Sequence, residues 1–180
     1  MSTRSNGFAA LALAVLALLL AASAASADGA NLGRPIDGAD IAPWDLSIMP
    51  DGAGLPPGSG TAAQGAKLFA EQCSACHGDN GKGTEFGAAV VGGPSRATLD
   101  GGKTIPNYWP YATTLFDYIR RAMPFTQPNS LTNEEVYALT AYILALNRLI
   151  GENDAMTAET LPQVRMPNRD NFITRFPDRI

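Results

Sequence analysis

The chain has 180 residues, with 13 lysines and arginines against 17 aspartates and glutamates and a formal net charge of −4. This acidic balance argues against nucleic acid or an anionic lipid surface as the main partner. One histidine and two cysteines leave few groups for acid–base or nucleophilic catalysis. The composition therefore disfavours an enzyme that works with its own side chains alone.

A secretory signal is predicted over residues 1–27. Arg4 precedes an apolar run from Phe8 to Ala22, and Ala25-Ser-Ala27 offers an A-x-A cleavage site. The alternative is an uncleaved membrane anchor, but the run is shorter than the roughly 20 residues that span a bilayer. We expect export across the inner membrane to the periplasm and no membrane anchoring after cleavage. Residues 28–180 suffice for one domain.

Residues 28–60 are predicted to form an extended arm, because their prolines and glycines disfavour both long helices and strand pairing in a β-sheet. The arm is either a disordered linker or is partly pinned to the domain by its apolar residues, which are Trp44, Leu46, Ile48 and Met49.

Three helices are predicted in the next segment, residues 61–150. Thr61 and Gln64 form a capping box that opens a short helix leading to Cys73. Residues 77–110 are rich in glycine and proline and should form loops. A second helix is predicted from Tyr111 to Ala122, before Pro124. A third should run from about residue 132 to 149, opened by a Thr132–Glu135 capping box and followed by Gly151. Residues 151–180 are predicted to be a wrapping tail of coil.

The strongest motif is Cys73-Ser-Ala-Cys76-His77, the Cys-x-x-Cys-His attachment sequence of a c-type haem. Two thiols at this spacing add to the two vinyl groups of one porphyrin, and the adjacent imidazole of His77 ligates the iron. A thioredoxin-like pair would need a βαβ setting, and a zinc site would need further Cys or His ligands that this chain hardly has. We therefore expect one covalent haem c.

The second axial ligand of the iron is expected to be a methionine. His77 is the only histidine, so ligation by two histidines is excluded. Pro124 disfavours helical geometry at Met123, which suits a ligand leaving a helix end. We expect His77 and Met123 to hold the iron, with Met166 in reserve; the alternative is that Met123 is ordinary core filler.

Two further residues are candidate contacts of the cofactor. A carbonyl in the loop around Pro94 is expected to accept the Nδ1–H of His77. The alternative is that Pro94 is an ordinary turn proline. The polar ends of Trp109, Tyr108 and Arg96 are expected to lie within reach of the haem propionates. The alternative for Trp109 is that it only packs against other buried side chains.

The sequence resembles class I cytochromes c over about residues 61–150. Gly65 and Phe69 on the first helix, with Leu139 and Tyr142 on the last, look like that family's contact between N- and C-terminal helices. The resemblance implies an all-α, class I cytochrome c fold around one covalent haem, with the extended N-terminal arm and the C-terminal tail added to it.

The flanks are similar to the cytochrome subunit of the Sox sulfur dehydrogenase and of periplasmic molybdenum sulfite dehydrogenases. The similar segments include Leu32-Gly-Arg-Pro35, Trp44-Asp45, residues 50–60, residues 108–124 and Met166-Pro-Asn-Arg-Asp170. That subunit often carries two haem domains, whereas this chain has one attachment motif. The resemblance implies a single-haem partner of a sulfite dehydrogenase and leaves membership of a full Sox complex open.

The expected function is single-electron transfer from a molybdenum sulfite or sulfur dehydrogenase catalytic subunit to a downstream cytochrome or oxidase, without catalysis by this chain. A generic carrier for another periplasmic enzyme is the alternative. A peroxidase or a haem sensor would need an open iron position, and a peroxidase also distal acid–base groups.

Overall fold

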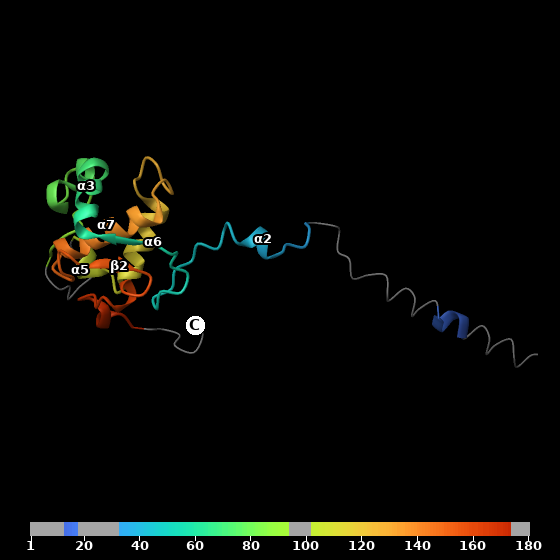
Figure 1. Cartoon of the computed structure of the whole chain (residues 1–180). Helices are drawn as coiled ribbons and strands as arrows, with labels where there is room; N and C mark the ends of the chain where they lie inside the picture. Colours follow the sequence, from blue (N-terminus) through green and yellow to red (C-terminus); the bar gives the residue numbers. More distant parts are fainter. Residues whose placement is uncertain (1–12, 18–32, 94–101, 174–180) are drawn as a thin grey trace, which may run out of the picture. The chain divides into compact units, whose positions relative to one another are not determined.

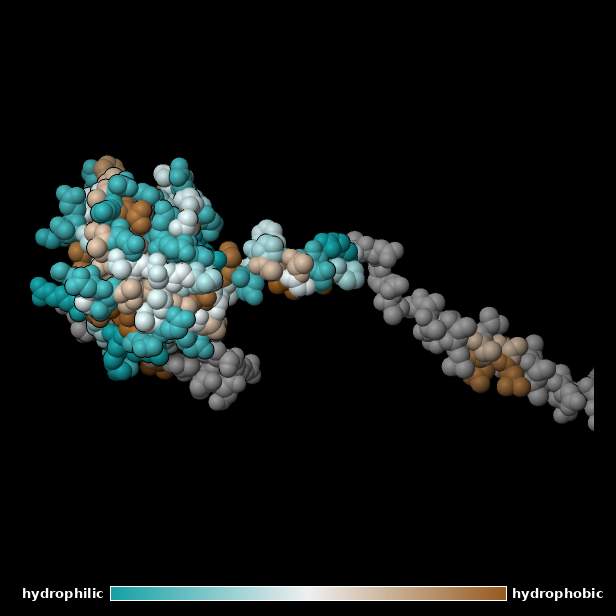
Figure 2. Space-filling model, in the orientation of Figure 1, coloured by the Kyte–Doolittle hydropathy of each residue, from teal (hydrophilic) through white to brown (hydrophobic). Residues whose placement is uncertain are grey.

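The computed structural model describes residues 13–17, 33–93 and 102–173. The chain divides into two compact units, Met1–Asp45 and Leu46–Ile180. Most of the predicted signal, residues 1–27, lies outside the described residues. No helix within the described ranges is long and apolar enough to cross a membrane. Figure 2 shows mainly hydrophilic residues on the visible face of the second unit, with small hydrophobic patches between them.

Two helices of the second unit pack closely against each other, and Figure 1 labels them α3 and α7. Helix α3 (Ala62–Gln72) begins at the predicted capping box of Thr61, and α7 (Asn133–Leu146) begins at that of Thr132. Both predicted capping boxes are therefore confirmed. They can be predicted from sequence because each joins a side chain to a backbone amide only three residues away. A Cβ on Gly65 would lie 2.7 Å from the Cβ of Tyr142, so only glycine allows this approach.

Helix α6 (Ala112–Ala122) confirms the second predicted helix to within one residue. It packs its buried face against α7, where the rings of Phe116 and Tyr137 lie 4.4 Å apart between centroids. The core also takes residues from α3 and from the tail. It contains Phe69, Leu115, Phe116, Ile119, Val136, Tyr137, Leu139, Leu144, Met156, Leu161 and Met166.

A two-stranded antiparallel ladder was not predicted. Strand β1 (Ser59–Thr61), at the end of the arm, pairs with β2 (Ala155–Thr157) of the tail, so that Gly60 lies opposite Met156. Short 3₁₀ helices η2 (Leu161–Gln163) and η3 (Arg169–Asn171) follow. The tail therefore wraps the core with more regular structure than the predicted coil.

Part of the arm belongs to the second unit. Ile48 and Leu55 pack against the core, and the Tyr137 hydroxyl donates to the carbonyl of Pro56 at 2.8 Å. Trp44 belongs to the first unit, and 84% of its surface is exposed. Helix α2 (Gly38–Ile41) in the first unit is a single turn that the proline-rich composition had not predicted.

Candidate functional site

The attachment motif lies on one turn of helix. Helix α3 ends at Gln72, and Cys73 joins it to α4 (Ser74–His77), with the amides of Cys76 and His77 both donating to the Cys73 carbonyl. Residues three and four positions apart lie on one side of a helix. The fold therefore presents both thiols and the imidazole on the same side of α4.

The two thiols differ in exposure. Cys73 is half-buried against the core, whereas Cys76 is exposed, and neither is in a disulfide. Burial, with a smaller contribution from Cys76, raises the pKa of Cys73 to about 11. Cys73 is therefore protonated at neutral pH and lacks the thiolate on which a thioredoxin-like redox pair depends.

The imidazole of His77 is held through its Nδ1 atom. Nδ1–H donates to the backbone carbonyl of Ala88, with 2.7 Å between nitrogen and oxygen. A carbonyl can only accept, so Nδ1 carries the proton and Nε2 keeps its lone pair for a metal. We had expected the acceptor near Pro94, which lies outside the described residues; the carbonyl that performs this role is that of Ala88.

The loop carrying Ala88 is fastened to α4 and to η1 (Asp79–Gly81). The hydroxyl of Thr84 donates to the Cys76 carbonyl at 2.6 Å, and the Val90 amide donates to the Gly81 carbonyl at 2.8 Å. A Cβ on Gly87 would lie 2.6 Å from that Cys76 oxygen, so the loop can approach only with glycine there. These contacts hold the loop against α4 and η1. They therefore place the Ala88 carbonyl beside the imidazole of His77.

The end of α7 holds the same loop from its other side. The Asn147 amide group donates to the carbonyls of Val90, at 3.2 Å, and Ile143, at 2.8 Å, and accepts from the Gly92 amide at 2.9 Å. These bonds end the helix at Leu146, earlier than the predicted residue 149. Arg148 then takes a positive φ of 58°, the left-handed conformation common just after a helix end.

A one-turn helix, α5 (Ile105–Tyr108), continues this support. The buried Asn107 accepts from the Thr104 amide at 2.8 Å and donates to the Gly102 carbonyl at 3.2 Å, and the Thr104 hydroxyl bonds to the carbonyl of Gly92. Neither Ala88 nor Asn107 was singled out from the sequence. Ala88 acts through its backbone, so its residue type carries no signal.

The candidate methionines have different environments. Met123 follows α6 with extended backbone, φ −120° and ψ 149°, as Pro124 predicts, and is half-buried against the core. Met166 is 1% exposed, within the core. The structure thus gives Met123 the predicted backbone at a helix end, while its ligation of iron stays a prediction.

Trp109 follows α5 and is half-buried. Its ring meets that of Tyr118 edge-on, with 5.4 Å between centroids and 73° between planes. This contact is the aromatic packing considered above, and contact with a propionate stays a prediction for Trp109. Arg96 lies outside the described residues.

These groups fit one covalent c-type haem. The turn carries two free thiols and an imidazole whose tautomer leaves Nε2 available, the donor set that this cofactor needs. In the described ranges, no three His, Cys, Asp or Glu side chains gather as metal ligands, which gives a protein-only zinc site no support.

Comparison with known proteins finds a family and several relatives. The family model "Cytochrome c" matches residues 62–147. The structure resembles a chain in the crystal structure of the sulfane dehydrogenase SoxCD from Paracoccus pantotrophus, with 39% identity and a TM-score of 0.74. That likeness covers 84% of this chain and 75% of the other.

Curated relatives match over shorter stretches. Thiosulfate dehydrogenase of Psychrobacter arcticus is 32% identical over 118 residues, 60% of this chain and 34% of that protein. Thiosulfate dehydrogenase of Stutzerimonas stutzeri is 29% identical over 90 residues, 49% of this chain and 28% of that protein. The FixP subunit of a Bradyrhizobium cbb3-type cytochrome c oxidase is 63% identical over 38 residues, 20% of this chain and 13% of that protein. The chain therefore spans about a third or less of the length of these relatives.

Proposed function

The chain belongs to the cytochrome c family, and we infer from this that it carries single electrons from a molybdenum sulfite or sulfur dehydrogenase to a downstream cytochrome or oxidase. One observation carries the choice of partner. The likeness to a sulfane dehydrogenase chain, at 39% identity, covers 84% of this chain and so exceeds the cytochrome c match at residues 62–147. A haem domain alone would serve many redox enzymes, whereas the flanks are the more specific part.

In this proposal the thiols of Cys73 and Cys76 would add to the two vinyl groups of the porphyrin and hold it through thioethers, and His77 and Met123 would ligate its iron. The haem, when bound, supplies an iron that alternates between the ferrous and ferric states. The Ala88 carbonyl orients the imidazole of His77 and, by accepting its Nδ1–H, makes Nε2 a stronger donor. A thioether ligand from Met123 would favour the ferrous state and raise the reduction potential.

The compartment we propose is the periplasm. Arg4, the apolar run after it and the Ala-x-Ala site support secretion. Both cysteines are free to bond a porphyrin, as attachment after export requires.

A second candidate is suggested by the two thiosulfate dehydrogenases among the relatives. In that case the chain itself would oxidise thiosulfate. We favour the electron carrier, because the likeness to the sulfane dehydrogenase chain covers 84% of this chain, whereas the matches to the two thiosulfate dehydrogenases cover 60% and 49% of it.

Stopped-flow spectroscopy tests the proposal. Ferric protein is mixed with sulfite and the molybdenum dehydrogenase of the same organism, and the α-band of reduced haem is followed. We expect fast reduction that needs both components and slows as salt rises, because the acidic protein should be steered to its partner electrostatically. Reduction by thiosulfate alone would support the second candidate, and no reduction by sulfite with the enzyme would refute the proposed partner.

A further inference from the structure

An exposed apolar segment precedes the haem domain. Residues 34–45, here called the α2 segment, contain three large apolar side chains that are mostly or nearly half exposed. Ile36 is 65% exposed, Ile41 47% and Trp44 84%, and Figure 2 shows hydrophobic surface along this part of the chain. Single exposed apolar residues are common, but three within nine residues, one of them a tryptophan, are typical of an interaction site.

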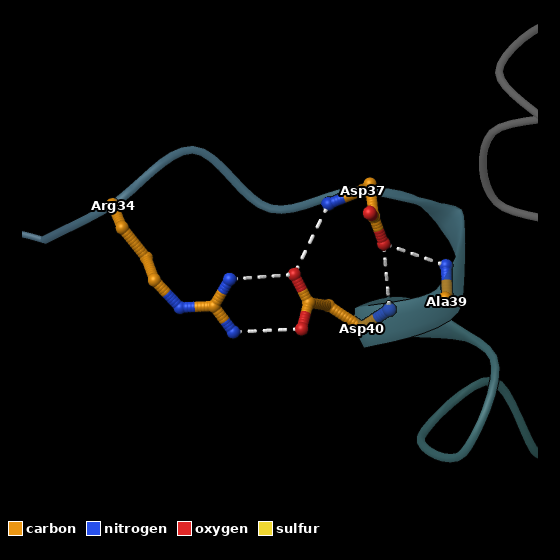
Figure 3. Close-up of polar contacts among 4 residues, drawn as sticks. All are labelled: Arg34, Asp37, Ala39 and Asp40. Carbon is orange, nitrogen blue, oxygen red and sulfur yellow. Dashed lines mark hydrogen bonds and ion pairs between the residues drawn. The ribbon is translucent and has the colours of Figure 1, made fainter.

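The α2 segment is held in shape by its own side chains (Figure 3). The Arg34 guanidinium makes two bonds to the Asp40 carboxylate, at 3.0 and 2.7 Å. The Asp37 carboxylate accepts from the amides of Ala39, at 2.9 Å, and Asp40, at 3.0 Å, and the Asp37 amide donates back to the Asp40 carboxylate. Such a turn loses less conformational entropy on binding than a flexible linker does.

The likeness to the solved dehydrogenase extends to this region. Leu46–Ile180 makes up three quarters of the chain, whereas the likeness covers 84% of it. Part of the matched structure therefore lies before Leu46. That chain comes from a sulfane dehydrogenase, SoxCD, so the resemblance favours the dehydrogenase over other occupants of the segment.

We propose that the α2 segment is a docking element that seats Trp44, with Ile36 and Ile41, in an apolar groove of the dehydrogenase catalytic subunit. Three aspartates against one arginine give the segment negative charge, so the groove should have a basic rim. The inference rests on the proposed function and adds a second binding site to it.

The proposal separates binding from electron transfer. The segment adjoins the haem domain at Leu46, so its docking raises the effective concentration of that domain at the enzyme without touching the haem. Loss of the anchor should weaken the complex and leave the rate at saturation unchanged. Substitution of a buried interface tryptophan commonly costs tenfold or more in affinity.

The experiment measures sulfite-dependent reduction of the full-length holoprotein by the dehydrogenase, as a function of cytochrome concentration. Trp44→Ala should raise KM by about tenfold or more with kcat unchanged. Trp44→Phe should restore most of the affinity, because a ring again fills the groove. Ile173→Ala is the matched control, an apolar residue 94% exposed outside the segment, and should change neither constant.

Each other outcome overturns the inference. Equal KM values for wild type and Trp44→Ala refute the docking element while leaving the proposed function intact. No reduction of the wild-type protein refutes the proposed function and, with it, this inference. Sedimentation in which Trp44→Ala abolishes self-association would assign the segment to a second copy of the chain instead, and loss of binding to anionic vesicles would assign it to a membrane surface.

Discussion

Substitution of Gly65 by alanine tests the helix crossing that supports the attachment turn. A Cβ at this position would overlap the carbonyl oxygen of Ala138, and would lie 2.5 Å from its carbon and 2.7 Å from the Cβ of Tyr142. Carbon atoms in contact are normally about 3.5–4.0 Å apart. Helices α3 and α7 would therefore have to separate by about 1 Å.

The cost follows from what the new methyl group meets. Overpacking by one carbon costs about 1–3 kcal/mol, and the upper end applies because backbone at Ala138 cannot rotate aside. Alanine regains about 1 kcal/mol over glycine in helix propensity. We expect Gly65→Ala to lower the free energy of unfolding by about 2 kcal/mol and the Tm by about 4–8 °C.

Denaturant unfolding of the holoprotein, followed by far-ultraviolet circular dichroism, measures this change. Ala70→Gly, at an exposed position of the same helix, is the control and should cost about 1 kcal/mol through propensity alone. Wild-type stability or better for Gly65→Ala would show that the two helices are not in the close contact described here.

Three further predictions concern the ligands, the core and the loop. Met123→Ala should abolish the methionine–iron charge-transfer band and lower the reduction potential. Met166→Ala should keep the band but lower the free energy of unfolding by about 2–5 kcal/mol. The opposite pattern would identify Met166 as the ligand. Burial raises the pKa of Tyr137 from 10.0 to about 12, so the folded state keeps a proton that the unfolded state loses. The contribution of protonated Tyr137 to the free energy of unfolding should therefore be fully present below pH 10 and be lost between pH 10 and 12. The variant Tyr137→Phe should lack this pH-dependent loss of stability. Asn147→Ala removes the acceptor of the Gly92 amide and should speed its hydrogen exchange, and unchanged exchange would contradict the role given to Asn147.

The helix beginnings were predictable because their causes are local. Thr61 with Gln64 and Thr132 with Glu135 are three residues apart, and each pair forms the box its sequence indicates. The class I cytochrome c fold was confirmed as well. The resemblance implied the contact between the first and last helices, and Gly65 lies against Ala138 and Tyr142 there.

The remaining features depend on contacts far apart in the sequence. The β1–β2 ladder is three residues long, too short for an alternating pattern, and its register depends on the tail folding back. The acceptor for His77 is a backbone carbonyl at Ala88, which any residue type would supply. The end of α7 is set by Asn147, whose partners Val90 and Gly92 belong to another loop.

The central claim is that Cys73 and Cys76 hold one haem beside His77, and intact-mass spectrometry of the purified protein after acid–acetone extraction tests it most directly. We predict that the colour stays with the polypeptide, that the mass exceeds that of a chain beginning near Asp28 by one haem, and that the double variant Cys73→Ser, Cys76→Ser loses that mass. Haem released into the solvent layer from the wild-type protein, with a polypeptide of unmodified mass, would contradict the account.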